Sequence, residues 1–145
     1  MKTKFYWHIH HGILLEPLTE PIGNRIKFIK ENKSKSEIPL RLRLLKPIEG
    51  NLPTEVIKAL EAYNKALEVY NKAFEYNKAK EAFYEALEAC SKTKEAFNKT
   101  LEACSKILRK YKKEIEVLHK KECPGCPWNG ETIFTRFDEK KQEWY

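Results

Sequence analysis

The most constraining feature of the chain is a seven-residue repeat over residues 62–118, inside a stretch that has no glycine or proline between Pro53 and Pro124. Units such as Ala-Tyr-Asn-Lys-Ala-Leu-Glu at 62–68 place apolar residues at positions one, two, five and six. At about 100° per residue these positions form one face roughly 140° wide. The sequence therefore predicts one very long amphipathic helix over residues 53–121, whose apolar face requires a partner.

Two arrangements could cover that face. A straight helix of this length would extend about 100 Å at 1.5 Å per residue, too far to be buried by the rest of the chain. It either pairs with copies of itself as a coiled coil or folds back as a helical hairpin. The repeat loses one residue within 76–81, and Tyr76–Lys78 is the best interior position for a turn. We favour self-association, in which the lost residue only adjusts the supercoil.

The face predicted to mediate self-association combines aromatic, leucine and cysteine side chains. Within it, Cys90 and Cys104 are expected to be small buried apolar residues, with an interchain disulfide as the alternative. Its members are Tyr63, Leu67, Tyr70, Phe74, Phe83, Leu87, Cys90, Phe97, Leu101, Cys104 and Leu108.

The predicted fold class is α+β dominated by helix. Residues 1–52 are expected to form a small β-α-β head, with a strand at 4–11, a helix at 20–32 capped by Thr19, and a strand at 38–45. Residues 122–145 are expected to contain a Cys-x-x-Cys turn, a third strand at 132–137 and a charged aromatic tail. The first and third strands would then pair with the second.

One group of residues has the chemistry of a metal site. His119, Cys123 and Cys126 follow the spacing His-x3-Cys-x2-Cys, and thiolates with imidazole are the ligands of structural zinc. The Cys-Pro-Gly-Cys turn resembles the knuckle of zinc ribbons and rubredoxin-like sites. That resemblance implies that both sulfurs face one ion, which His8 or His10 could also contact. A redox-active cysteine pair and a simple turn with reduced cysteines are the alternatives.

The segment His8-Ile9-His10 has the pattern His–hydrophobic–His. It resembles the metal-binding pair of single-strand-cleaving, relaxase-type endonucleases. The resemblance implies a divalent ion held on one face of a strand and a tyrosine nucleophile, for which Tyr63 and Tyr70 are candidates. The heptad repeat already accounts for these tyrosines as packing residues, so a metal-dependent nuclease is the second alternative function.

The formal net charge of +7 raises the possibility of an acidic partner. Residues 1–52 and the long helix carry the excess of basic groups, whereas residues 122–145 are acidic overall. A nucleic-acid-binding protein is therefore the first alternative function. The residues expected to contact phosphates are Arg41, Arg43, Lys46, Arg109, Lys110, Lys112 and Lys113.

Several functions have no support in the sequence. A glycine-rich phosphate loop and a serine nucleophile motif are both lacking, so no small-molecule substrate is identified. The N-terminus has no apolar signal-peptide core, and no apolar run reaches transmembrane length, which predicts a cytoplasmic protein without membrane contact. We therefore expect a non-enzymatic structural, scaffolding or protein-interaction protein that forms homo-oligomers, with structural zinc as its cofactor. Small basic proteins of this plan occur among phage- and virus-encoded products.

Overall fold

A computed structural model describes residues 3–79 and 83–145 of the chain, without the side chains of residues 74–79, 83–87, 89 and 90. The fold is mixed α+β, with antiparallel sheets. The chain divides into two compact units. The first unit, here called the head, contains the N-terminal residues through Asn51 together with Glu114–Tyr145. The second, here called the hairpin, contains Leu52–Lys113.

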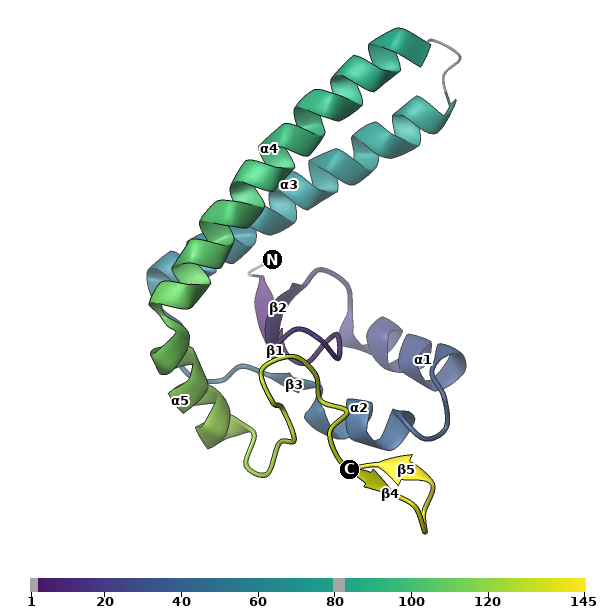
Figure 1. Cartoon of the computed structure of the whole chain (residues 1–145), viewed down its shortest axis with the longest axis vertical. Helices are drawn as coiled ribbons and strands as arrows, with labels where there is room; N and C mark the ends of the chain where they lie inside the picture. The colour runs from purple at the N-terminus through teal and green to yellow at the C-terminus, as the bar shows by residue number, and fades with distance from the viewer. Residues whose placement is uncertain (1–2, 80–82) are drawn as a thin grey trace. The chain divides into compact units, whose positions relative to one another are not determined.

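The head contains a three-stranded antiparallel sheet in the order β2-β1-β3 (Figure 1). The central strand β1 (Lys4–Trp7) pairs with β2 (Leu15–Leu18) on one side and with β3 (Lys46–Pro47) on the other. β2 was not predicted. The strand expected over 4–11 stops at Trp7, because His8 has a φ of +52° and turns the chain.

Two helices follow the first hairpin of the head. α1 (Ile22–Asn32) confirms the predicted helix, although Pro21 is its N-cap and no side chain caps it, so the Thr19 cap was wrong. α2 (Ile38–Leu44) replaces the strand predicted over 38–45. Its buried residues include Leu40 and Leu44, and spacing by four positions puts them on one helical face.

The C-terminal segment packs on α2. Ile133 is fully buried with Leu40 and Leu44, and Trp128, Phe134 and Trp144 pack against this cluster. Instead of a strand over 132–137, the segment forms a short antiparallel pair, β4 (Phe137–Asp138) and β5 (Glu143–Trp144). The predicted pairing of first and last strands with the second was therefore wrong, because the second of those strands is a helix.

α5 (Lys112–Glu122) ends at a residue that ties three segments of the head together. The Glu122 carboxylate accepts a hydrogen bond from Trp7 Nε1 at 2.8 Å and further bonds from the backbone N–H groups of Glu49 and Gly50. Trp7 is completely buried. The end of α5 is thereby held next to the central strand of the sheet.

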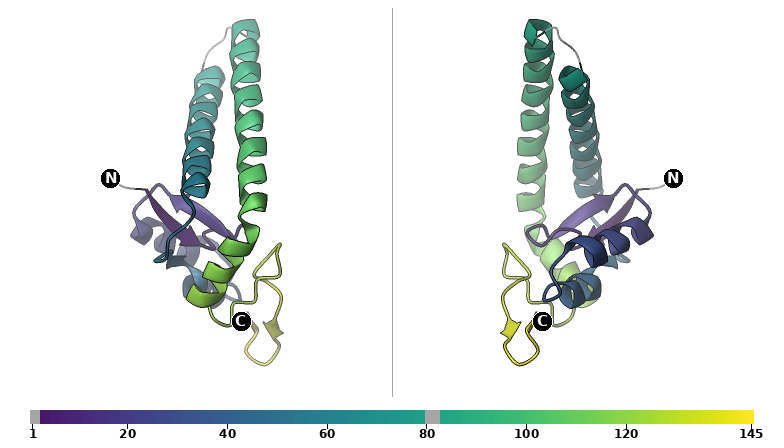
Figure 2. Two further views of the ribbon diagram at one scale, coloured as in Figure 1. Left: turned by 90° about the vertical axis from the view of Figure 1, so that its left-hand side faces the viewer. Right: turned by 90° about the vertical axis from the view of Figure 1, so that its right-hand side faces the viewer.

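The hairpin consists of α3 (Thr54–Ala79) and α4 (Phe83–Lys110), which lie side by side (Figures 1 and 2). They run antiparallel, because Lys110 at the end of α4 forms an ion pair with Glu55 at the start of α3. The single long helix is therefore not what the structure contains. Helix α3 continues through the turn expected at Tyr76–Lys78, and the connection at residues 80–82 lies outside the described residues.

The contact between α3 and α4 buries only part of their apolar faces. Val56, Leu60 and Cys104 are buried. The rings of Tyr63 and Tyr70 both contact the ring of Phe97, with centroids 5.5 Å and 5.6 Å apart, and these rings are only half-buried. One helix cannot cover the broad face of the other, since two helices in contact bury a narrower seam.

Of the predicted self-association face, Leu67 and Leu108 are half-buried and Leu101 remains 41% exposed. The side chains of Phe74, Phe83, Leu87 and Cys90 lie outside those that the structure describes. Among the described helices, none has both the length and the apolar character needed to cross a membrane.

Candidate metal centre

Three side chains from distant parts of the sequence meet inside the head. His8 follows β1, His119 lies in the last turn of α5, and Cys126 is the last residue of the Cys-Pro-Gly-Cys turn. His8 Nε2 lies 2.9 Å from His119 Nε2 and 3.3 Å from Cys126 Sγ. All three atoms lie within 4.8 Å of one another. This set, here called the ligand group, could hold a metal ion.

The two separations that involve His8 are close to those around one tetrahedral ion. With zinc–nitrogen bonds of about 2.0 Å and zinc–sulfur bonds of about 2.3 Å, tetrahedral angles place two nitrogens about 3.3 Å apart and nitrogen and sulfur about 3.5 Å apart. The His8–His119 and His8–Cys126 distances are shorter than these by a few tenths of an ångström, and the His119–Cys126 separation lies within 4.8 Å. A small outward movement of the rings would therefore admit the ion.

The backbone at His8 explains why this ring points into the head. Continued extended structure would alternate the side chains, whereas the positive φ of His8 redirects the chain into a loop. The His8 N–H donates to the carbonyl of Leu14 at 3.0 Å, which closes this loop. Non-glycine residues with positive φ are uncommon and carry a conformational cost that the surrounding structure must offset.

The Cys-Pro-Gly-Cys turn places Cys126 beside the end of α5. The Cys123 N–H donates to the His119 carbonyl at 2.7 Å, and the Cys126 N–H donates to the Cys123 carbonyl at 3.2 Å. Gly125 has a φ of +73°. Proline followed by a residue with positive φ is the pattern of a type II turn, in which glycine is favoured at the third position.

Aromatic rings surround the ligand group. The Trp7 ring contacts His119 at 5.0 Å between centroids, and the Trp128 ring contacts His8 at 5.4 Å. His8 and His119 are both buried, and Cys126 is half-buried. His8 Nδ1 is also buried and has no hydrogen bond of normal geometry within the described chain. The site is thus largely apolar, which strengthens electrostatic interactions with a bound cation.

Burial sets the protonation states of the ligand group. Burial, together with the nearby His119, lowers the pKa of His8 to about 4, and the backbone of Ile13 opposes this only weakly. Burial likewise lowers the pKa of His119. Both imidazoles are therefore neutral near pH 7, which is the form that binds metal ions.

Burial shifts the pKa values of the two thiols in the opposite direction to those of the histidines. Burial raises the pKa of the Cys126 thiol. Burial also raises the pKa of the Cys123 thiol, and the nearby Cys126 adds to this effect, so that the pKa of Cys123 is about 11. The charge of Lys46 acts against this shift at both thiols. These thiols are poor nucleophiles without a metal, since the thiolate is the reactive form.

The structure separates His10 from the ligand group. His10 is exposed, and its Nδ1 lies 2.7 Å from the Glu16 carboxylate. The resemblance to relaxase-type endonucleases implied that His8 and His10 form a pair on one strand face. The structure shows no such pair. Cys123 is also buried, but it is not a member of the ligand group.

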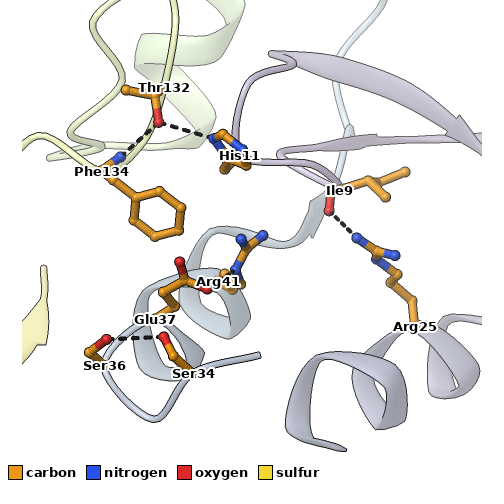
Figure 3. A network of polar contacts seen from close by, with 9 residues as sticks. All are labelled: Ile9, His11, Arg25, Ser34, Ser36, Glu37, Arg41, Thr132 and Phe134. Carbon is orange, nitrogen blue, oxygen red and sulfur yellow. Dashed lines mark hydrogen bonds and ion pairs between the residues drawn. The ribbon is translucent and has the colours of Figure 1, made fainter. Parts of the chain in front are cut away.

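The loop that carries His8 is fixed from two sides. Arg25 of α1 donates to the Ile9 carbonyl at 2.8 Å (Figure 3). The Ile133 N–H donates to the carbonyl of His11 at 3.1 Å. His11 Nδ1 also lies 3.2 Å from Thr132 Oγ1. Sequence reasoning missed Arg25 and Glu122 as supports of the site, and no local pattern marks them, because both act across long sequence separations.

The predicted phosphate-contacting residues are placed differently from one another. Arg41 is buried, with its guanidinium over the Phe134 ring at 5.0 Å and its Nε 3.3 Å from Glu37. Burial makes it unavailable to a nucleic acid. The remaining residues of that set, namely Arg43, Lys46, Arg109, Lys110, Lys112 and Lys113, are exposed.

Comparison of the chain with protein-family models, curated proteins and solved structures gave no match.

Proposed function

We propose that this protein is a non-enzymatic structural protein whose head is stabilised by a bound zinc ion and whose hairpin is a protein-interaction element. The observation that carries the proposal is the convergence of His8, His119 and Cys126. Two neutral imidazoles and a thiol at these separations match the ligand preferences of zinc. A metal bound there would connect three segments that are far apart in sequence, as expected of an ion with a structural role.

Metal analysis of untagged protein, purified without chelator, tests the head. We expect native mass spectrometry to find about one zinc per chain and a double variant, His8→Gln with Cys126→Ser, to bind none. Replacing Cys104 by serine in the hairpin provides the matched control, because it removes a buried cysteine outside the ligand group. Wild-type protein that remains metal-free in the presence of micromolar zinc would refute the metal-binding part of the proposal.

The interaction role rests on the apolar surface that the two helices leave uncovered. Tyr63, Tyr70 and Phe97 are half-buried, and Leu101 and Val69 are 41% and 55% exposed. Apolar residues at four of every seven positions make a face wider than the two-position seam of a two-stranded coiled coil. The partner we propose is a second copy, because a second hairpin supplies two faces of the same width and repeat.

Sedimentation velocity over a range of protein concentrations tests this association. We expect wild-type protein to form dimers or larger oligomers and Leu101→Lys to shift the distribution toward monomer. The control is Val117→Lys, which introduces the same charge at a position that is 68% exposed in the head. A wild-type monomer at all concentrations would show that the hairpin does not associate with copies of itself.

A further inference from the structure

We propose that Cys123 supplies the fourth ligand of the bound metal, so that the site is a closed centre of two histidines and two cysteines. The inference rests on the proposed metal binding and deepens it, because coordination number separates two kinds of site. Structural zinc is held by four protein ligands, whereas a catalytic zinc keeps one position for water or substrate. The ligand group accounts for only three of the four positions.

Elimination favours Cys123 over other metal-binding side chains in this part of the described head. The Glu122 carboxylate is occupied by Trp7 and the backbone N–H groups of Glu49 and Gly50. His10 is directed to Glu16. His11 is exposed and lies against Thr132 and the Phe134 ring.

The backbone keeps Cys123 close to two members of the ligand group. Its N–H is bonded to the His119 carbonyl and its own carbonyl accepts from Cys126, so it is connected directly to both. Its side chain is 3% exposed. A change between staggered χ1 rotamers moves a cysteine sulfur by about 3 Å. A rotation of this kind, which would turn Cys123 Sγ toward the ligand group, is the rearrangement that the proposal requires.

The surroundings favour a second thiolate over a water molecule. Trp7 and Trp128 pack on the two histidine rings and leave apolar surface around them. A bound water needs two to four polar partners, which an aromatic wall does not provide. Two thiolates would neutralise the charge of a divalent zinc, and the positive charge of Lys46 acts on both sulfurs.

X-ray absorption at the zinc edge of the zinc-loaded full-length protein tests the proposal without any substitution. Sulfur at about 2.3 Å and nitrogen at about 2.0 Å are distinguishable shells. We expect two sulfurs and two nitrogens. One sulfur with three lighter ligands would overturn the assignment of Cys123 while leaving metal binding intact. Absence of bound zinc would instead refute the proposed function on which the inference rests.

Cobalt substitution of cysteine variants gives an independent measurement. We expect Cys123→Ser and Cys126→Ser each to lose about half of the sulfur-to-cobalt charge-transfer absorption. Each variant should also lose more affinity than the roughly 10–100-fold typical of losing a group that only orients a ligand. Cys104→Ser should retain the wild-type spectrum and affinity. A Cys123→Ser spectrum identical to that of wild type would contradict the proposal.

Discussion

At the scale of single residues, His8 determines whether the ligand group forms. Its ring contacts both His119 and Cys126, and it is 2% exposed. It also holds an uncommon positive φ and a buried Nδ1 without a normal hydrogen bond. Buried unsatisfied polar atoms are rare in folded proteins and call for a functional explanation. A metal on Nε2 would make this ring a ligand that joins three segments, although Nδ1 on its other side would still lack a normal partner.

The stability of the metal-free protein is expected to depend on pH through His8. Its pKa is about 4 when folded, against 6.5 in the unfolded chain. Above pH 6.5 the ring is neutral in both states. As the pH falls from 6.5 to 4, only the unfolded chain takes up the proton, so the free energy of unfolding decreases, in total by about 3 kcal/mol. Below pH 4 this contribution stays lost.

Chemical denaturation of chelator-treated protein between pH 4 and 7.5 measures this dependence. His119 acts in the same direction, since burial lowers its pKa as well. The variant His8→Gln should show a clearly shallower dependence than the wild type. Equal profiles for wild type and His8→Gln would contradict the prediction.

Gly125 is expected to be needed for metal affinity as well as for stability. Its φ of +73° costs a residue with a side chain about 1–2 kcal/mol, although a Cβ there would meet no atom within 4 Å. Gly125→Ala should therefore strain the turn that positions Cys126 and weaken zinc binding. Gly130→Ala is the matched control, because its φ is +104° in another open turn.

Competition titrations with a zinc indicator distinguish the two glycines. Both alanine variants should lower the free energy of unfolding, but only Gly125→Ala should weaken zinc binding measurably. Equal affinities in the two variants would show that the turn conformation at Gly125 does not control the site.

At the scale of elements, local sequence patterns predicted one helix of the head correctly. They failed for the segment 38–45, whose secondary structure depends on contacts with distant residues. The helix in residues 20–32 was found, because Ile22, Ile26 and Ile29 share one face. Leu40, Leu42 and Leu44 alternate with arginines and so resembled a strand, but a helix buries Leu40 and Leu44 equally well. Pro39 in the first helical turn was the available signal for a helix.

In the candidate site too, sequence spacing revealed the residues that lie close together in the chain. It did not reveal which distant residue joins them. The spacing of His119 and Cys126 is local, so the sequence alone pointed to both, together with Cys123, which is not in the ligand group. Choosing between His8 and His10 required the conformation of the loop after β1, which depends on contacts with Arg25 and Ile133. The separation of the long repeat into two helices was weighed but not favoured, because no glycine or proline marks a turn.

Arg25 in α1 is expected to stabilise the loop that carries His8. Its guanidinium is buried and donates to the Ile9 carbonyl at 2.8 Å. Arg25→Gln should leave that buried carbonyl without its donor and lower the free energy of unfolding by about 1–3 kcal/mol. Thermal denaturation of the full chain, followed by tryptophan fluorescence, compares Arg25→Gln with Lys27→Gln. Lys27 is an exposed residue on the same helix. A loss no larger than that of Lys27→Gln would contradict the role of Arg25.

At the scale of the whole molecule, the proposed zinc binding predicts that removing the metal affects the head and the hairpin differently. The ligand group and its supports lie entirely in the head. The hairpin is held by contacts between α3 and α4, including the Lys110–Glu55 ion pair and the rings around Phe97. Removal of zinc should therefore destabilise the head and leave the helices of the hairpin formed.

The positions of the tryptophans allow the two units to be followed separately in the intact chain. Trp7, Trp128 and Trp144 all belong to the head, whereas α3 and α4 provide most of the helical signal in circular dichroism. Chelator should lower the unfolding temperature detected by tryptophan fluorescence by several degrees, since a ligand stabilises only the state that binds it. The transition detected at 222 nm should shift much less. Equal shifts by both probes would mean that the two units unfold as one and that the metal stabilises both.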